Sequence, residues 1–203
     1  MEANTSSYKI ILGSSSVPRR TILAEMGYKF TIMTADIDEK SIRKESPEEL
    51  VVALAEAKAE AILRRLSLDD YVNDAEPTLL ITCDQVVVYE GLIREKPSSK
   101  EEAHQFLKDY SGRHAATVGS VLVTNLKTGF KKGEWDRAEI YFNEIPDETK
   151  EKLVEEGITL NMAGGLVIEH PLISPFVKEV AGTMDSVMGL PKALTKRLLK
   201  EAL

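Results

Sequence analysis

The segment from Thr78 to Tyr89 constrains the fold of this 203-residue chain more than any other stretch. It reads TLLITCDQVVVY, with apolar side chains at both odd and even positions. Successive side chains of a β-strand point to opposite faces of the sheet. A strand that is apolar on both sides is typical of a sheet covered on both faces by helices. The segment therefore predicts a central strand of an α/β fold.

The remaining patterns agree with that fold class, because helical and strand signals alternate along the chain and hairpin signals lie between them. This alternation predicts an α/β protein with a mixed sheet rather than a purely parallel one. A polar connector over 69–77 and a Gly/Pro-rich region with short strands after residue 156 complete the pattern. We expect strands at 8–12, 78–89, 92–96, 118–124 and up to 142, and helices at 17–26, 46–66, 99–111 and 147–156 and from Pro191.

Composition limits the class of protein. A net charge of −7 argues against a general nucleic-acid binder, which usually has a basic face. The single cysteine, Cys83, excludes an internal disulfide framework and fits a reducing compartment. We interpret Cys83 as a small core residue. Met1–Ser7 lacks the features of a secretory signal, and no apolar run is long enough to cross a bilayer. We expect a cytoplasmic globular protein without membrane partners.

Asp84 stands inside the apolar run of the central strand. Burying a carboxylate there destabilises the fold by roughly several kcal/mol unless the group is paired, hydrogen-bonded or bound to a metal. A general base or metal ligand is one interpretation of Asp84, and a structural ion pair is the other. We favour the functional interpretation, because a buried charge with a merely structural role usually adds no stability.

Lys58 interrupts the apolar face of the helix predicted over 46–66. The apolar stripe of that helix contains Leu54 and Ile62, and Lys58 lies four residues from each of them. The residue is either a lysine whose stem packs while its ammonium reaches water, or a cation directed toward a site.

A serine-rich turn joins the first strand to the first helix. The run from Leu12 to Arg20, LGSSSVPRR, places Pro18 near the first helical position and two arginines in the first turn. Cations are unfavourable at the positive end of a helix dipole unless an anion lies between them and the helix. The turn predicts a phosphate site, or else a capped turn whose arginines are solvated.

A hairpin predicted at Glu90-Gly91 adds another cation. Pairing Tyr89 with Leu92 and continuing the count places Lys96 opposite Gln85. Lys96 would then lie near Asp84 and Gln85 of the central strand.

The charged candidates come from separate elements of the chain. Arg19, Lys58 and Lys96 supply positive charge, and Asp84 and Glu39 supply carboxylates. This composition predicts a pocket that binds a polyphosphate together with a divalent ion.

Short segments spread from Leu12 to the C-terminal helix carry a family resemblance. They are LGSSSVPRR at 12–20, DE at 38–39, AKA at 57–59, CDQV at 83–86, EKP at 95–97, SGR at 111–113, AGG at 163–165 and SVMGLP at 186–191. Their order and spacing resemble the Maf family of nucleoside triphosphate pyrophosphatases, relatives of the inosine triphosphatase-like enzymes. The resemblance implies one domain over residues 1–203, possessing two lobes around a central cleft, with a strongly twisted sheet and flanking helices.

The resemblance also implies an activity and its residues. The family reaction cleaves a nucleoside triphosphate between its α and β phosphates, with a divalent cation, Mg²⁺ or Mn²⁺. Asp84 matches the general base. The phosphate- or metal-site positions of the family fall on Ser14, Arg19, Glu39, Lys58 and Lys96. Within this set we expect Glu39 and Asp84 as metal ligands and the others as substrate contacts. A homodimer is implied as well.

Base specificity in the resembling family depends on three positions. One branch, acting on dTTP and UTP, has Arg, Thr and Gln there, and another, acting on 7-methyl-GTP, has Trp, Gln and Glu. Here these positions are Pro18, Gln85 and Glu169, within a segment less rich in glycine than usual. A carboxylate at Glu169 suits the two adjacent N–H donors of guanine. We favour 7-methyl-GTP-like purines, with dTTP or UTP as the alternative.

A hypothesis of another class is a regulatory protein that binds nucleotide without hydrolysing it. The presence of Asp84, Lys58 and Lys96 speaks against a loss of chemistry. Release of pyrophosphate from a nucleotide in the presence of Mg²⁺ distinguishes the two hypotheses.

Overall fold

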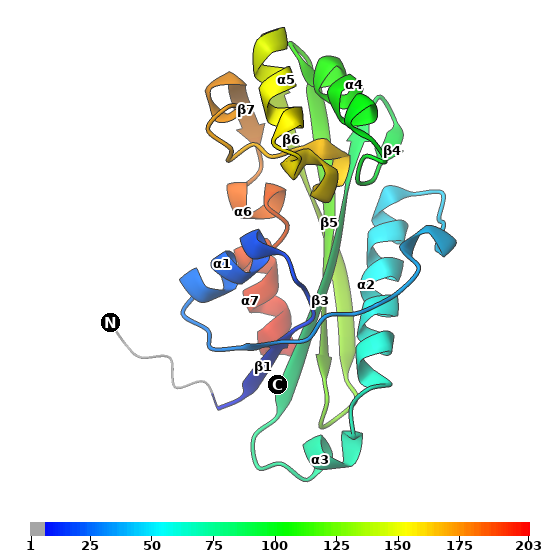
Figure 1. The fold of residues 1–203 in the computed structure, drawn as a ribbon. Helices are drawn as coiled ribbons and strands as arrows, with labels where there is room; N and C mark the ends of the chain where they lie inside the picture. The colour runs from blue at the N-terminus through cyan, green and yellow to red at the C-terminus, as the bar shows by residue number, and fades with distance from the viewer. Residues whose placement is uncertain (1–6) are drawn as a thin grey trace. The chain divides into compact units, whose positions relative to one another are not determined.

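A computed structural model describes residues 7–203 and contains a seven-stranded mixed sheet flanked by helices (Figure 1). The strand order is β2-β1-β3-β5-β6-β7, and β4 pairs with β3. The predicted α/β fold with a mixed sheet is confirmed. Residues 1–6, which carry most of the expectation about a signal segment, lie outside the described range. The strands are β1 (Lys9–Leu12), β2 (Thr31–Ile32), β3 (Thr78–Tyr89), β4 (Leu92–Arg94), β5 (His114–Asn125), β6 (Lys131–Phe142) and β7 (Val177–Ala181).

Parallel and antiparallel pairs occur in the same sheet. β1 pairs in parallel with both β2 and β3, and Leu12 stands beside Ile81 at the end of the second ladder. β4 and β7 each form antiparallel pairs, with β3 and β6 respectively. The β3–β4 turn has positive φ at both central residues, Glu90 (48°) and Gly91 (77°), as a two-residue type I′ hairpin requires.

The helices begin largely where the sequence places them. Serine caps, whose hydroxyls accept from the backbone N–H three residues later, start three of them: Ser16, Ser46 and Ser99. The α-helices are α1 (Val17–Glu25), α2 (Pro47–Leu63), α3 (Leu68–Val72), α4 (Lys100–Tyr110), α5 (Asp147–Glu155), α6 (Met184–Val187) and α7 (Lys192–Glu201).

Two predicted segments differ from the structure. The polar connector predicted from Asp69 overlaps the helix α3, which is too short to show a helical repeat of apolar residues. The region after residue 156 holds one strand, β7, where several were predicted. The rest forms 3₁₀ turns, which local glycine and proline geometry favours over strands. These turns are η2 (Ile158–Asn161), η3 (Ala163–Gly165) and η4 (Ser174–Phe176), and an earlier one is η1 (Glu39–Ser41).

The chain divides into two compact units. Unit 1 comprises the chain up to Asp84, together with Gly119–Asp136 and Asp185–Leu203, and unit 2 comprises Gln85–Val118 and Arg137–Met184. The expectation of one domain with two lobes around a cleft stays a prediction. No helix among the described residues is long and apolar enough to cross a membrane.

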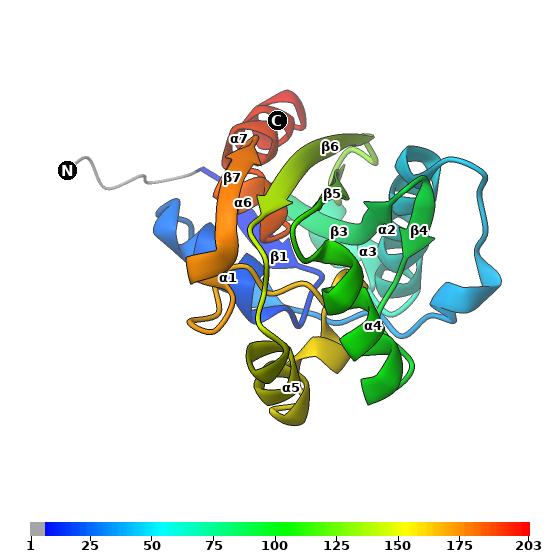
Figure 2. The same ribbon diagram turned by 90° about the horizontal axis from the view of Figure 1, so that it is seen from above.

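In unit 1, helices cover both faces of β1 and β3, as the apolar pattern of β3 predicts. Figures 1 and 2 show α1 and α7 on one side of these strands and α2 on the other. Alternate strand residues serve the two faces: Ile81 packs with the α1 and α7 side, and Leu80 packs against α2. Cys83 is a buried core residue, 1 % exposed, as expected.

In unit 2, α4 and α5 pack side by side (Figure 2), and both contact η2. β6 and β7 pair through Glu139–Phe142 and Val177–Ala181, with an irregularity at Phe142. Unit 2 thus has a short antiparallel ladder and a helical layer of its own.

Candidate active site

Three charged side chains meet in unit 1 around the ammonium group of Lys58. Lys58 Nζ lies 2.5 Å from Asp84 Oδ1, 3.0 Å from Glu39 Oε1 and 3.4 Å from the Cys83 carbonyl oxygen. An ammonium group has three hydrogens, so these three oxygens use its full donor capacity. The structure therefore brings together Glu39, Lys58 and Asp84, as the sequence predicts.

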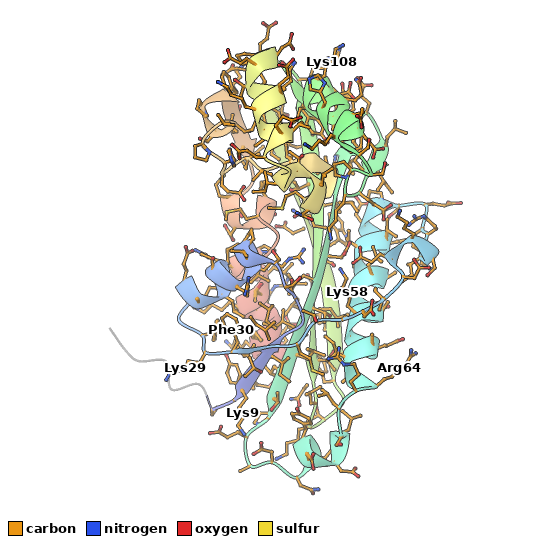
Figure 3. The ribbon with its side chains drawn as sticks, viewed as in Figure 1. Lys9, Lys29, Phe30, Lys58, Arg64 and Lys108 are labelled. Atoms are coloured by element: carbon orange, nitrogen blue, oxygen red, sulfur yellow. The ribbon has the colours of Figure 1, made fainter. Side chains whose placement is uncertain are left out.

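Lys58 points toward the sheet and not toward water. Its side chain is 13 % exposed, and Figure 3 shows it on the sheet side of α2, whereas Arg64 extends away from the helix. The interpretation in which the ammonium reaches solvent is wrong, because Asp84 and Glu39 offer it two carboxylates.

Asp84 is a nearly buried acid beside two cations. Burial raises the pKa of its carboxyl above the ordinary value, while the charges of Lys58 and Arg19 oppose that rise. Its side chain keeps 9 % exposure. The raised pKa makes the Asp84 carboxylate a stronger proton acceptor than an exposed aspartate.

Two hydroxyl groups hold α2 against the strands. Ser120 of β5 donates to the Val51 carbonyl of α2 (2.6 Å) and accepts from the Asp84 N–H (3.2 Å). Thr82 of β3 donates to the Ala55 carbonyl, one helical turn further along α2 (2.8 Å). These bonds fix the position along the sheet of the helix that carries Lys58. The sequence analysis missed Ser120, since a serine in a strand gives no signal of a helix contact.

Arg19 is held by two segments of unit 1. Its Nε donates to the Gly189 carbonyl (2.9 Å) and its Nη1 donates to Ser14 Oγ (3.4 Å). Ser14 is nearly buried and also accepts from the Ser16 N–H. Among the described residues Arg19 Nη2 has no hydrogen-bond partner, so it can donate to a ligand at the start of α1. The anchor at Gly189 lies 170 residues away and has no local sequence signal.

The expected metal ligands are two carboxylates rather than a closed cage. Within residues 7–203 no group of three or more His, Cys, Asp and Glu side chains is placed to hold a metal ion. Mg²⁺ commonly takes one or two protein carboxylates and completes its shell with water and substrate phosphates. Glu39 and Asp84, which share Lys58, fit that donor set.

Lys96 belongs to unit 2, where it lies beyond the end of a strand. The predicted hairpin register is confirmed for Tyr89/Leu92 and for two further pairs. Its extension to a Gln85/Lys96 pair is wrong, because β4 ends at Arg94. The reason is a competing bond: the Glu95 carbonyl accepts from the Gly164 N–H (2.9 Å).

The three expected base-reading positions lie on different elements. Pro18 is in the first turn of α1 in unit 1 and is partly exposed. Gln85 is the partly exposed residue of β3 that follows Asp84, and Glu169 is exposed on a turn of unit 2. Their roles stay predictions.

Unit 1 thus presents a buried carboxylate, an exposed carboxylate, and two cations fixed by hydrogen bonds. Positive groups at set positions stabilise negative charge that develops on a phosphoryl group. A carboxylate with a raised pKa can take a proton from a nucleophile. The arrangement suits cleavage of a phosphoric anhydride.

Known proteins match almost the whole chain. A family model described as Maf-like protein matches residues 9–202. A 7-methyl-GTP pyrophosphatase from Dictyostelium discoideum is 39% identical over 95% of this chain and 96% of its own. A dTTP/UTP pyrophosphatase from Clostridium acetobutylicum is 33% identical over 90% of this chain and 92% of its own. A 7-methyl-GTP pyrophosphatase from Idiomarina loihiensis is 32% identical over 90% and 88% of the two chains.

Proposed function

This chain belongs to the Maf family, and from that premise we propose that it hydrolyses a nucleoside triphosphate to the monophosphate and pyrophosphate. The observation that carries the proposal is the contact of Lys58 with both Asp84 and Glu39 beside the fixed guanidinium of Arg19. Relatives of both substrate types are named as pyrophosphatases, which favours an enzyme over a regulator that only binds nucleotide.

Asp84 acts as the general base in this proposal. Its carboxylate accepts a proton from a water molecule as the water oxygen attacks the α-phosphorus. The bond between that phosphorus and the bridging oxygen breaks, and pyrophosphate leaves. Lys58 holds Asp84 Oδ1, which restricts the carboxylate to one orientation, and burial raises the pKa of that carboxyl, which makes it a stronger base.

The cations bind the triphosphate and its leaving group. Arg19 offers Nη2 at the start of α1, where backbone N–H groups also attract anions. Lys58 can exchange its contact with Glu39, whose side chain is 40 % exposed, for a phosphate oxygen. Lys96, exposed in unit 2, supplies a further ammonium group, and Ser14 a hydroxyl.

Glu39 and Asp84 would hold the divalent cation, Mg²⁺ or Mn²⁺. When bound, the cation neutralises negative charge on the phosphates of the substrate. Both carboxylates contact Lys58, so the same group of oxygens serves the cation and the lysine.

We favour 7-methyl-GTP-like purines as substrates. Gln85 and Glu169 match the pattern of that branch, and the Dictyostelium relative carries that name. The Glu169 carboxylate can accept from the two N–H donors of a guanine edge, and a positive charge on the base strengthens that contact. The alternative, dTTP or UTP, is favoured by the name of the Clostridium relative. Pro18 matches neither branch, since one has Arg and the other Trp at that position.

A panel of nucleotides tests this proposal. The protein is incubated with 7-methyl-GTP, GTP, dTTP, UTP and ATP in the presence of Mg²⁺ or Mn²⁺, and pyrophosphate and orthophosphate are measured separately. We expect pyrophosphate without orthophosphate, fastest with 7-methyl-GTP. Binding without any product contradicts the enzyme, and a preference for dTTP selects the alternative.

A homodimer in the cytoplasm completes the proposal. The single cysteine supports a reducing compartment, and family membership supports the dimer. Light scattering coupled to size-exclusion chromatography distinguishes a dimer from a monomer.

A further inference from the structure

Lys96 extends from a short segment of unit 2 that is fixed on both sides. Before it, the Glu95 carbonyl accepts from the Gly164 N–H (2.9 Å). After it, Pro97 is buried, and its Cγ lies 3.3 Å from the position that a Cβ on Gly165 would occupy. The turn η3 therefore holds the backbone around an exposed lysine.

Gly164 links this segment to the interior of unit 2. Its carbonyl accepts from the Tyr110 hydroxyl (2.9 Å), while its N–H is bonded to Glu95. Its φ is +60°, and an added Cβ would lie 2.5 Å from Val87 Cβ. Both the conformation and the space thus require glycine, and its two polar groups are both engaged.

Tyr110 is itself fixed by its surroundings. It is fully buried, and its ring lies with those of Tyr89 and Phe106 around the guanidinium of Arg94, at 5.3, 4.5 and 4.3 Å from the ring centroids respectively. Asp109 pairs with Arg94 Nη2 (2.5 Å). Such contacts restrain a ring in one position.

The Tyr110 hydroxyl remains a donor at neutral pH. Burial raises its pKa to about 12, so the group keeps its proton. The hydroxyl can therefore donate to the Gly164 carbonyl over the whole pH range in which such an enzyme is assayed.

We propose that Tyr110 is a positioning residue for Lys96, because its hydroxyl holds Gly164, and Gly164 holds the Glu95 carbonyl next to Lys96. The proposal rests on the proposed function, in which Lys96 contacts the triphosphate. In it the phenol touches no substrate, and it acts by keeping the ammonium of Lys96 in one place before the nucleotide binds.

Two tyrosines give a matched pair of variants. Tyr110→Phe removes the hydroxyl that holds Gly164. Tyr89→Phe removes a hydroxyl of the same aromatic cluster, one that accepts from the exposed Arg113 (2.8 Å) and has no link to Gly164. We expect kcat/KM to fall about 3- to 10-fold in Tyr110→Phe, the change that corresponds to the loss of one hydrogen bond, and to stay unchanged in Tyr89→Phe.

A double-mutant cycle separates positioning from general loss of structure. In a Lys96→Ala background Tyr110→Phe should cause no further fall in kcat/KM, because the group that it positions is gone. An equal fall in both backgrounds overturns the proposal. Pro97→Ala loosens the same segment from its other side, and it should behave as Tyr110→Phe does in both backgrounds.

Amide hydrogen exchange of the nucleotide-free protein gives a readout apart from activity. The Gly164 N–H should exchange faster in Tyr110→Phe than in wild type or Tyr89→Phe, and unchanged exchange overturns the proposal. If Lys96→Ala lowers kcat/KM and Tyr110→Phe does not, the positioning role is wrong while the proposed function stands. If Lys96→Ala keeps the wild-type kcat/KM, the proposed role of Lys96 fails, and Tyr110 has nothing to position.

Discussion

The two units fix their candidate residues in different ways. In unit 1 the charged side chains bond to one another and to backbone carbonyls, as Lys58 does with Asp84, Glu39 and Cys83. In unit 2 the candidates Lys96 and Glu169 are exposed, and the backbone next to Lys96 is held by Gly164, which joins Glu95 to Tyr110.

This difference matches two tasks in the proposed reaction. Acid–base chemistry depends on distances set before the substrate arrives, which buried and mutually bonded side chains provide. Contact with a base or a phosphate tail tolerates more movement, and exposed side chains on a rigid backbone suffice. We therefore expect changes in unit 1 to lower turnover most, and changes in unit 2 to alter affinity and preference.

The largest effect is expected at Asp84. Asp84→Asn keeps the size of the side chain but removes the base, so kcat should fall at least about a hundredfold, the low end for a general base, while nucleotide binding remains. Asp74→Asn is the control, because Asp74 pairs with Lys9 at the exposed edge of the same unit. Steady-state kinetics and calorimetric binding measure both. Near-normal turnover in Asp84→Asn would show that the chemistry lies elsewhere.

Lys58→Met comes next. It removes the group that orients Asp84, and loss of a hydrogen bond to a charged group corresponds to about 10- to 100-fold in kcat. Lys9→Met, which breaks the exposed pair with Asp74, should leave kcat unchanged. If both lysine variants behave alike, the distinction between a fixed cluster and an ordinary surface pair disappears.

The pH profile sharpens the same point. The active form of Asp84 is the carboxylate, and burial raises its pKa, so kcat should decline as pH falls through a value above the ordinary carboxyl range. Lys58 opposes the rise, so in Lys58→Met the decline should begin at a higher pH than in wild type. A shift to lower pH would contradict the assigned electrostatics.

Ser120→Ala tests the helix contact with a smaller change. The hydroxyl joins Val51 of α2 to the Asp84 N–H, so its loss should reduce kcat about 3- to 10-fold with little change in KM. Thr195→Val is the control, since it removes a buried hydroxyl of α7 that donates to the Pro191 carbonyl just before that helix. An equal loss in both variants indicates a general effect on folding.

The smallest effect on turnover is expected in unit 2. Glu169→Gln should leave hydrolysis intact but reduce the preference for guanine-type bases, by about tenfold for one charged hydrogen bond. Glu155→Gln, on the surface of α5, serves as the control. An unchanged substrate profile would place base reading at other residues.

Sequence patterns predict much of unit 1 because its unusual residues break local rules. Asp84 stands out in an apolar strand and Lys58 in an apolar helical stripe; Asp84 proves to be buried, Lys58 partly buried, and the two are paired. Ser120 and Gly189 break no such rule. Their roles arise from segments distant in the chain, which local periodicity does not report.

The pattern predicts less of unit 2 for a related reason. The hairpin register follows from Glu90-Gly91, but the end of β4 depends on Gly164, which lies far along the chain from Glu95. The 3₁₀ turns between α5 and β7 have no period to recognise, so short strands were expected there instead.

Hydrolysis in ¹⁸O-labelled water tests the central claim most directly. The products from the preferred nucleotide are examined by ³¹P NMR for wild type and Asp84→Asn. If Asp84 directs water to the α-phosphorus, the label enters the monophosphate and pyrophosphate stays unlabelled, and the variant forms the same products far more slowly. Label in pyrophosphate, or release of diphosphate and orthophosphate, would contradict the account.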